Sequence, residues 1–117
     1  MRISCTTTDT SLAATDEVYL AQSIEGQDLM AFAKGTSSAK QYTLSFYARS
    51  DKTGTYVLEL WDNVSNRHVS ATYTISSADT WEQKILTYPA DTGGSAYDSS
   101  NANTAGIEFF VKPLSLI

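Results

Sequence analysis

The sequence predicts an all-β fold, a two-sheet antiparallel β-sandwich of the jelly-roll type. Between residues 39 and 91, apolar and polar side chains alternate along three segments, which is the two-residue period of half-buried strands. Gly and Asp-Thr turn signals separate these segments. The strands expected along the whole chain are short and recur roughly every 8 to 12 residues, which is typical of a sandwich and not of a βαβ fold.

Two strands and one helical turn are expected in the first third of the chain. Residues 2–6 predict a short first strand, and residues 18–24 predict a second. One face of the second strand consists of Val18, Leu20, Gln22 and Ile24. Residues 27–33 contain no β-branched residue, and Leu29 and Phe32 lie three positions apart. This spacing predicts a short helical turn that covers an end of the sandwich.

The most regular alternation lies in residues 42–49 and 55–61. The expected inward face of these two segments consists of Leu44, Phe46, Ala48, Tyr56, Leu58 and Leu60. Residues 50–54 make a short connection between them that is rich in turn-forming residues. We therefore expect the two strands to pair as a hairpin.

Residues 62–66 predict the next turn, and residues 67–76 predict the strand that follows it. The inward face of that strand is expected to carry Val69, Ala71, Tyr73 and Ile75. A long loop at residues 91–104 is rich in Gly, Ser, Asn and Ala. It leads to a last clear strand at residues 106–112, which places Ile107, Phe109 and Val111 together.

The strand expected at residues 81–88 has an ambiguous inward face. Trp81 and Ile85 favour one side of this strand, whereas Leu86 and Tyr88 favour the other. Both pairs are large and apolar, so the two-residue period alone does not select the buried side. We expect Trp81 to lie at the edge of the core.

Composition limits the partners that the chain can have. Its 117 residues suffice for one autonomously folding domain, residues 1–117. A net charge of −5 without a Lys/Arg cluster argues against nucleic acid as a partner. Cys5 is the only cysteine, which excludes an internal disulfide. We see no signal peptide in the first 20 residues and no apolar run that predicts membrane insertion.

The chemistry-bearing residues do not predict an enzyme, a cofactor or a defined metal site. His68 is the only histidine, and its expected place is the edge of a strand. The acidic residues are scattered, and Glu59 with Glu82 is the one pair that could approach the carboxylate separation of a glycosidase. The 91–104 loop offers oxygen ligands of the kind calcium prefers but lacks the EF-hand spacing. A flexible loop is favoured over a calcium site.

Four residues make a candidate carbohydrate-binding site: Tyr47, Trp61, Arg49 and Glu59. The strand period predicts Tyr47 and Trp61 on the face opposite the apolar residues. Exposed aromatic rings stack on the C–H faces of sugars, and Arg49 and Glu59 supply polar partners that orient the ring. The alternative is that an adjoining subunit or the chain's own loops bury both aromatic side chains.

A series of short phrases resembles one protein family. In order, they are Gln22-Ser23-Ile24-Glu25-Gly26, Thr43-Leu44-Ser45-Phe46-Tyr47, Thr53-Gly54-Thr55-Tyr56, Tyr73-Thr74-Ile75, Thr80-Trp81-Glu82 and Asp91-Thr92. Their order and spacing resemble a jelly-roll domain of tailed-bacteriophage virion proteins, especially tail-fibre and receptor-binding proteins, which is in turn similar to carbohydrate-binding modules. The structural positions that match are Leu44, Phe46, Tyr56, Leu58, Leu60 and Trp81.

The resemblance implies a non-enzymatic module on the virion surface, outside the cell, which contacts host glycans or holds a fibre together as a trimer. Two departures from the family suggest a domain truncated at both ends: Met1 begins just before the first strand, and residues 112–117 stop where another strand is expected. We therefore expect Leu114, Leu116 and Ile117 to be buried against another copy in a homo-oligomer or against an exchanged strand. The alternatives to glycan binding are a purely structural assembly domain, or a carbohydrate-binding module detached from a glycoside hydrolase.

Overall fold

A computed structural model of the chain describes residues 19–97 and 107–113, together with the isolated positions 2, 4, 7, 11 and 13. Its described strands are β1 (Leu20–Ile24), β2 (Tyr42–Ala48), β3 (Gly54–Asp62), β4 (Arg67–Ile75), β5 (Glu82–Tyr88) and β6 (Ile107–Pro113). Two short helices, α1 (Gly26–Leu29) and η1 (Met30–Phe32), follow β1. The predicted all-β class is confirmed. The strand predicted at residues 2–6 falls mostly outside the described residues, and so does the burial predicted for Leu114, Leu116 and Ile117.

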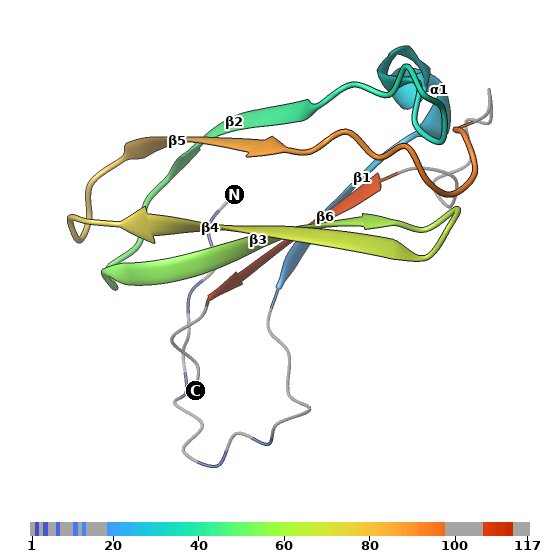
Figure 1. Cartoon of the computed structure of the whole chain (residues 1–117). Helices are drawn as coiled ribbons and strands as arrows, with labels where there is room; N and C mark the ends of the chain where they lie inside the picture. Colours follow the sequence, from blue (N-terminus) through green and yellow to red (C-terminus); the bar gives the residue numbers. More distant parts are fainter. Residues whose placement is uncertain are drawn as a thin grey trace.

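The described strands form two antiparallel sheets. One has four strands in the order β1-β6-β3-β4, and the other has two strands, β2 and β5. Figure 1 shows the β2–β5 sheet lying over the larger sheet, with α1 at one end. In the smaller sheet Tyr42 pairs with Tyr88 and Ala48 with Glu82, whereas in the larger sheet Gly54 pairs with Ile75 and Asp62 with Arg67. The described strands therefore form a sandwich of one four-stranded layer and one two-stranded layer.

The predicted hairpin between residues 42–49 and 55–61 is wrong. β2 pairs with β5, and β3 pairs with β4 and β6, so the connection at residues 49–53 crosses from one sheet to the other. Tyr56 stabilises this crossing, since its hydroxyl donates to the Lys52 carbonyl and is hydrogen-bonded to the Ser50 hydroxyl, at 2.9 Å each. Two strands with the same alternation can pair side by side or face each other across a core, which is why the pattern favoured the wrong arrangement.

The core lies between the two sheets, and both sheets contribute side chains to it. In the described part of the chain, the buried apolar residues are Leu29, Leu58, Leu60, Tyr73, Ile75, Tyr88 and Tyr97. The Phe46 ring meets the Tyr73 ring edge-on across the sandwich, with centroids 5.1 Å apart. The Tyr88 hydroxyl donates to the Leu58 carbonyl at 3.0 Å and so connects β5 to β3. The inward faces predicted for the segments at 42–49, 55–61 and 67–76 are confirmed.

The pairing register settles the inward face of β5. Tyr42 and Leu44 of β2 face the core, and they lie opposite Tyr88 and Leu86. Residues of the other parity must then point outward, because successive side chains alternate across a strand. Trp81 is 61% exposed, so its expected place at the edge of the core is wrong.

The predicted helical turn is confirmed as α1 and η1. Leu29 is buried, and the Phe32 ring stacks on Tyr42 with centroids 4.5 Å apart. The turn ends at Ala33, which has a left-handed backbone with φ of 51° and donates its N–H to the Met30 carbonyl. Within residues 19–97 and 107–113 we find no helix with the length and apolarity to cross a membrane.

Candidate functional site

The four predicted site residues lie on two separate surfaces. Tyr47 belongs to β2 and Trp61 to β3, and these strands are in different sheets. Each aromatic alternates with an inward-facing neighbour, Phe46 or Leu60, so each points away from the core on its own side of the sandwich. Tyr47 and Trp61 therefore cannot contact one ligand ring together.

The outer face of the β2–β5 sheet gathers a different set of aromatic and apolar side chains. This β2–β5 outer face consists of Thr43, Ser45, Tyr47, Trp81, Gln83, Ile85 and Thr87. Tyr47 lies opposite Gln83, and Ser45 lies opposite Ile85, which makes Ile85 a diagonal neighbour of Tyr47. Trp81 precedes Gln83 by two positions and shares its side by strand alternation. Tyr47, Trp81 and Ile85 are 64%, 61% and 63% exposed.

Hydrogen-bonding groups surround these exposed side chains. Gln83 Nε2 donates to Ser45 Oγ at 3.2 Å across the strand pair. The hydroxyls of Thr43 and Thr87 lie 3.2 Å apart farther along the same face. The face therefore combines apolar area with amide and hydroxyl groups, the mixture that orients a polar ligand on an aromatic surface.

Hydrogen bonds within the turn that precedes β5 fix the position of Trp81. Glu82 Oε1 accepts the backbone N–H groups of Ser76 and Ser77, at 2.9 and 2.8 Å. A hydrogen bond from Lys84, supported by these two N–H groups, lowers the pKa of Glu82. The Asp79 N–H donates to the Ser50 carbonyl at 2.8 Å and ties the turn to the β2–β3 crossing. Trp81 is thus positioned by its neighbours' backbone contacts while its own side chain stays exposed.

Arg49 lies at the same end of the sandwich as Trp81. Its guanidinium Nη2 donates to Asp79 Oδ1 at 3.0 Å, and both side chains are well exposed. Of the predicted site residues, Arg49 and Tyr47 therefore remain near one another, on the side of the β2–β5 sheet. Trp81 joins them in place of Trp61.

Trp61 and Glu59 belong to a second cluster, on the outer side of the four-stranded sheet. Trp61 pairs with His68 across β3 and β4, and their rings stack with centroids 5.8 Å apart. Trp61 Nε1 donates to Asn66 Oδ1 at 3.2 Å, and His68 Nδ1 lies 2.5 Å from Glu59 Oε1. β4 is an edge strand, so the expected place of His68 is confirmed. The polar atoms of this cluster are engaged with one another.

The geometry does not bring Glu59 and Glu82 together as a catalytic carboxylate pair. Glu59 lies on β3 and Glu82 on β5, in different sheets, and each is bound to other protein groups. In the described part of the chain, no group of three His, Cys, Asp or Glu side chains could hold a metal ion. Asp91, at the start of the loop considered for calcium, instead receives two hydrogen bonds of 2.9 Å from Arg67. Residues 98–104 of that loop lie outside the described residues.

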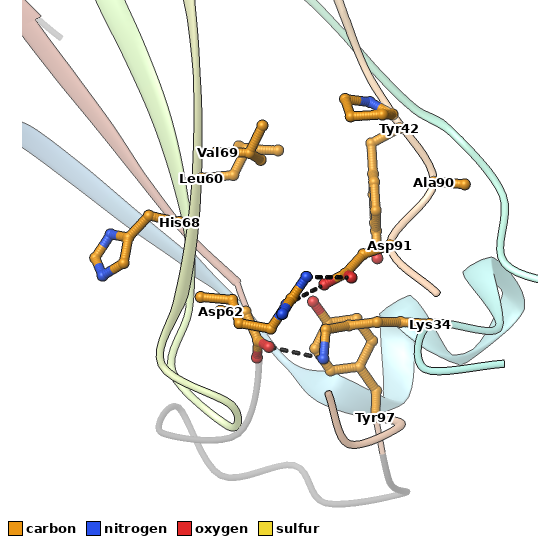
Figure 2. A pocket seen from close by; sticks show the side chains of 11 residues that line it. Lys34, Tyr42, Leu60, Asp62, His68, Val69, Ala90, Asp91 and Tyr97 are labelled. Carbon is orange, nitrogen blue, oxygen red and sulfur yellow. Dashed lines mark hydrogen bonds and ion pairs between the residues drawn. The ribbon is translucent and has the colours of Figure 1, made fainter. Parts of the chain in front are cut away.

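A pocket of about 230 Å³ opens between the sheets at the end near α1. We call it the end pocket, and Figure 2 shows its polar side chains Lys34, Tyr42, Asp62, Asp91 and Tyr97. The sequence pattern did not point to it, because its charged residues come from loops and strand ends, where charges are usually solvated. The strand period did not assign Trp81 to the surface either, since Trp81 and Ile85 lie on one side of the strand and Leu86 and Tyr88 on the other.

Comparisons with protein-family models, with curated proteins and with solved structures found no match to this chain. The resemblance to phage virion jelly-roll domains therefore stays a prediction that rests on the residues quoted for it.

Proposed function

We propose that the chain is a non-catalytic recognition module that binds a carbohydrate through the β2–β5 outer face. The observation that carries this proposal is the group of large side chains, Tyr47, Trp81 and Ile85, that are each more than half exposed on one rigid strand pair. The proposal agrees with the resemblance to virion surface domains that contact host glycans.

The physical basis is the complementarity of a sugar ring to such a surface. The C–H groups of a pyranose face stack on the aromatic rings of Tyr47 and Trp81, while its hydroxyls exchange hydrogen bonds with Gln83 and Ser45. Arg49 is already held by Asp79, so its remaining donors can be directed at a ligand without a large loss of side-chain freedom. Binding of this kind needs no metal or catalytic carboxylate.

A second candidate function is assembly without a ligand, in which the same face packs against another copy. Ile85 favours it, because an aliphatic side chain offers no stacking surface to a sugar and yet is 63% exposed. In a fibre this would be a trimer interface. A module detached from a glycoside hydrolase would use the face as the first candidate does.

A broad glycan array tests the proposal with the purified protein and its Trp81→Ala and Tyr47→Ala variants. The matched control is Trp61→Ala, which removes the other tryptophan, from the opposite surface. We expect binding by the parent and by Trp61→Ala, and loss of binding by the other two. Loss in Trp61→Ala alone would move the site to the four-stranded sheet. A blank array, together with self-association that Ile85→Ser abolishes, would favour the assembly function.

A further inference from the structure

Ile85 differs in chemistry from the two aromatic side chains of the β2–β5 outer face. It is more than half exposed, as they are, but it has no ring that could stack on the face of a sugar. An aliphatic side chain in this position favours contact with a small apolar group, such as a methyl group. A pyranose whose substituents are all hydroxyl or hydroxymethyl groups carries no methyl group. Ile85 therefore indicates a ligand with a further substituent.

The strand register places Ile85 beside hydrogen-bonding side chains. Ser45 lies directly opposite Ile85, and Gln83 comes two positions before it on the same side of β5. Directly opposed side chains on one face of an antiparallel pair have Cβ atoms about 4.5–5.5 Å apart. One substituent of a ligand can therefore touch the aliphatic side chain and a polar neighbour at the same time.

Ser45 and Gln83 keep hydrogen-bonding capacity for a ligand. Gln83 Nε2 donates to Ser45 Oγ at 3.2 Å, and the two side chains make no other hydrogen bond within the described part of the chain. A glutamine amide has two N–H donors and a carbonyl oxygen, and a serine hydroxyl can also donate its own hydrogen. After their mutual hydrogen bond, the pair still offers both donors and an acceptor. This combination complements the N–H and C=O groups of an amide.

The side chains around Ile85 carry no charge that would select a charged ligand. None of the residues that define the β2–β5 outer face is an Asp, Glu, Lys, Arg or His. Glu82 and Lys84 alternate with the residues of this face along β5 and are ion-paired with each other. At one end of the sheet, Arg49 is paired with Asp79. The face therefore favours a neutral substituent over an ammonium or a carboxylate group.

From this arrangement we infer that the β2–β5 outer face selects a sugar that carries an N-acetyl group. The pyranose ring stacks on Tyr47, and the acetyl methyl group contacts Ile85. The amide of the acetyl group exchanges hydrogen bonds with Gln83 and Ser45. Tyr47 and Ile85 are diagonal neighbours, about 7–8 Å apart, a separation that a ring and one substituent together can span. The inference rests on the proposed function, and it makes Ile85 a specificity-determining residue.

The test compares ligands that differ in one substituent. The probes are short oligomers of N-acetylglucosamine, glucose and glucosamine with equal length and linkage, and the methyl glycosides of N-acetylgalactosamine and galactose. Isothermal titration calorimetry measures their binding to the full chain. Ile85→Ser removes the aliphatic contact, and Gln83→Met removes the amide while keeping the length of the side chain. Thr87→Ala is the matched control, since it changes another exposed residue of the same strand and face.

We expect the acetylated ligand of at least one series to bind about tenfold more tightly than its hydroxyl counterpart, because it adds a buried methyl group and a hydrogen bond. The glucosamine oligomer should bind no better than the glucose oligomer, because no residue that defines the face has a carboxylate. Ile85→Ser and Gln83→Met should each reduce the preference for the acetylated ligand several-fold and leave the binding of the hydroxyl counterpart unchanged. Thr87→Ala should keep the preference of the parent protein.

Some outcomes would overturn this inference and leave the proposed function standing. They are equal affinity for acetylated and unacetylated ligands, tighter binding of glucosamine, a preference that survives in both Ile85→Ser and Gln83→Met, or array binding only to glycans without an N-acetyl group. Absence of binding to every probe and to the whole glycan array would overturn the proposed function as well.

Discussion

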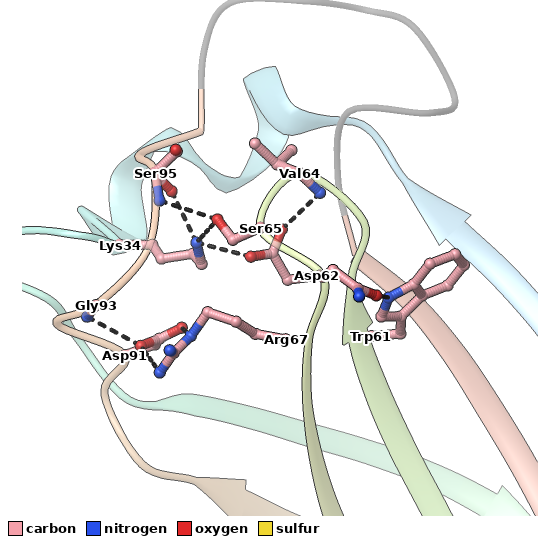
Figure 3. Close-up of polar contacts among 10 residues, drawn as sticks. Lys34, Trp61, Asp62, Val64, Ser65, Arg67, Asp91, Gly93 and Ser95 are labelled. Carbon is pink, nitrogen blue, oxygen red and sulfur yellow. Dashed lines mark hydrogen bonds and ion pairs between the residues drawn. The ribbon is translucent and has the colours of Figure 1, made fainter.

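The β2–β5 outer face and a group of residues at one end of the sandwich differ in how far their side chains are buried and bonded within the protein. We call the second group the end cluster, and it consists of Lys34, Asp62, Ser65, Arg67, Asp91 and Ser95. In the end cluster, Lys34 is 2% exposed and is bound by three oxygen atoms, from Asp62, Ser65 and Ser95 (Figure 3). On the outer face, Tyr47 and Trp81 are more than half exposed. Side chains that stabilise the fold, such as Lys34, make contacts within the protein. The exposed aromatic side chains of the outer face are available to a partner.

Mutations in the end cluster should therefore lower the stability of the protein, whereas mutations on the outer face should lower its binding to a ligand. The predictions below test this difference and the packing beside it. They run from the largest expected loss of stability to the smallest.

Lys34→Met should cause the largest loss, because it leaves the Asp62 carboxylate buried at 6% exposure without its cation. Breaking a buried pair in this way costs about 3–5 kcal/mol of the free energy of unfolding. The control is Arg49→Met, which breaks the exposed pair with Asp79 and should cost less than ~1 kcal/mol. Urea unfolding measures both.

A second variant separates the charge from the packing. In Lys34→Met/Asp62→Leu both charges are gone, so much of the lost stability should return. An equal loss in the single and double variants would mean that Lys34 acts through its packing. A loss no larger than that of Arg49→Met would contradict the structural role of the pair.

Gly35→Ala should cause the next largest loss. The backbone of Gly35 has a φ of 76°, and a Cβ there would lie 2.7 Å from the Gly94 carbonyl oxygen, which belongs to the loop that carries Ser95. A residue other than Gly in this conformation costs about 1–3 kcal/mol before the clash is counted. Gly93→Ala is the control, because the nearest atoms to its Cβ would belong to the flexible Arg67 side chain, at 3.3 Å. Thermal unfolding should rank Gly35→Ala well below Gly93→Ala, and the reverse order would contradict this close approach.

Tyr88→Phe should cost about 1 kcal/mol, since it removes the hydrogen bond between the sheets to the Leu58 carbonyl. Burial raises the pKa of Tyr88 and of Tyr73 to about 12. A raised pKa favours the neutral phenol in the folded state, so this stability is complete below pH 10.0 and is lost as the pH rises toward 12.

Urea midpoints measured across that alkaline window should fall for the parent protein, and should fall less steeply for Tyr88→Phe, which has one buried phenol fewer. Identical slopes would indicate that Tyr88 is not buried as a neutral phenol. Tyr47→Phe is the control, since it changes a phenol on the outer face.

Strand alternation was sufficient to predict the class of the fold and the inward side of several strands. Leu44, Leu58 and Tyr73 all face the core as their spacing indicates. Alternation describes one strand at a time, however, and two strands of the same parity can be neighbours or face each other. The hairpin prediction was wrong for this reason. The expectation that Tyr47 and Trp61 share one surface depended on that hairpin, so it was wrong as well.

The site residues that the sequence did not indicate were missed for two physical reasons. Trp81 directly precedes β5, and the register of β5 with β2 determines which side of β5 faces the solvent. That register depends on contacts between residues far apart in the sequence. Lys34 and Asp62 lie 28 positions apart in a loop and at a strand end, and their burial follows from the closure of the sandwich end. Neither kind of information is present in a local pattern of polar and apolar residues.

Trp81→Ala and Tyr47→Ala should have the smallest effect on stability of all these changes, within about 0.5 kcal/mol, because exposed side chains add little to the folded state. Trp61→Ala should cost more, since Trp61 is partly buried, stacks on His68 and donates to Asn66. Urea unfolding at two protein concentrations measures all three variants.

If Trp81→Ala costs as much as Trp61→Ala and the loss grows with protein concentration, the outer face is covered by a second copy in solution, because only association makes stability depend on concentration. If the loss is small at every concentration, Trp81 and Tyr47 are exposed in solution, and folding does not account for two large aromatics on the same strand pair. Retained stability together with lost glycan binding would then assign both side chains to recognition.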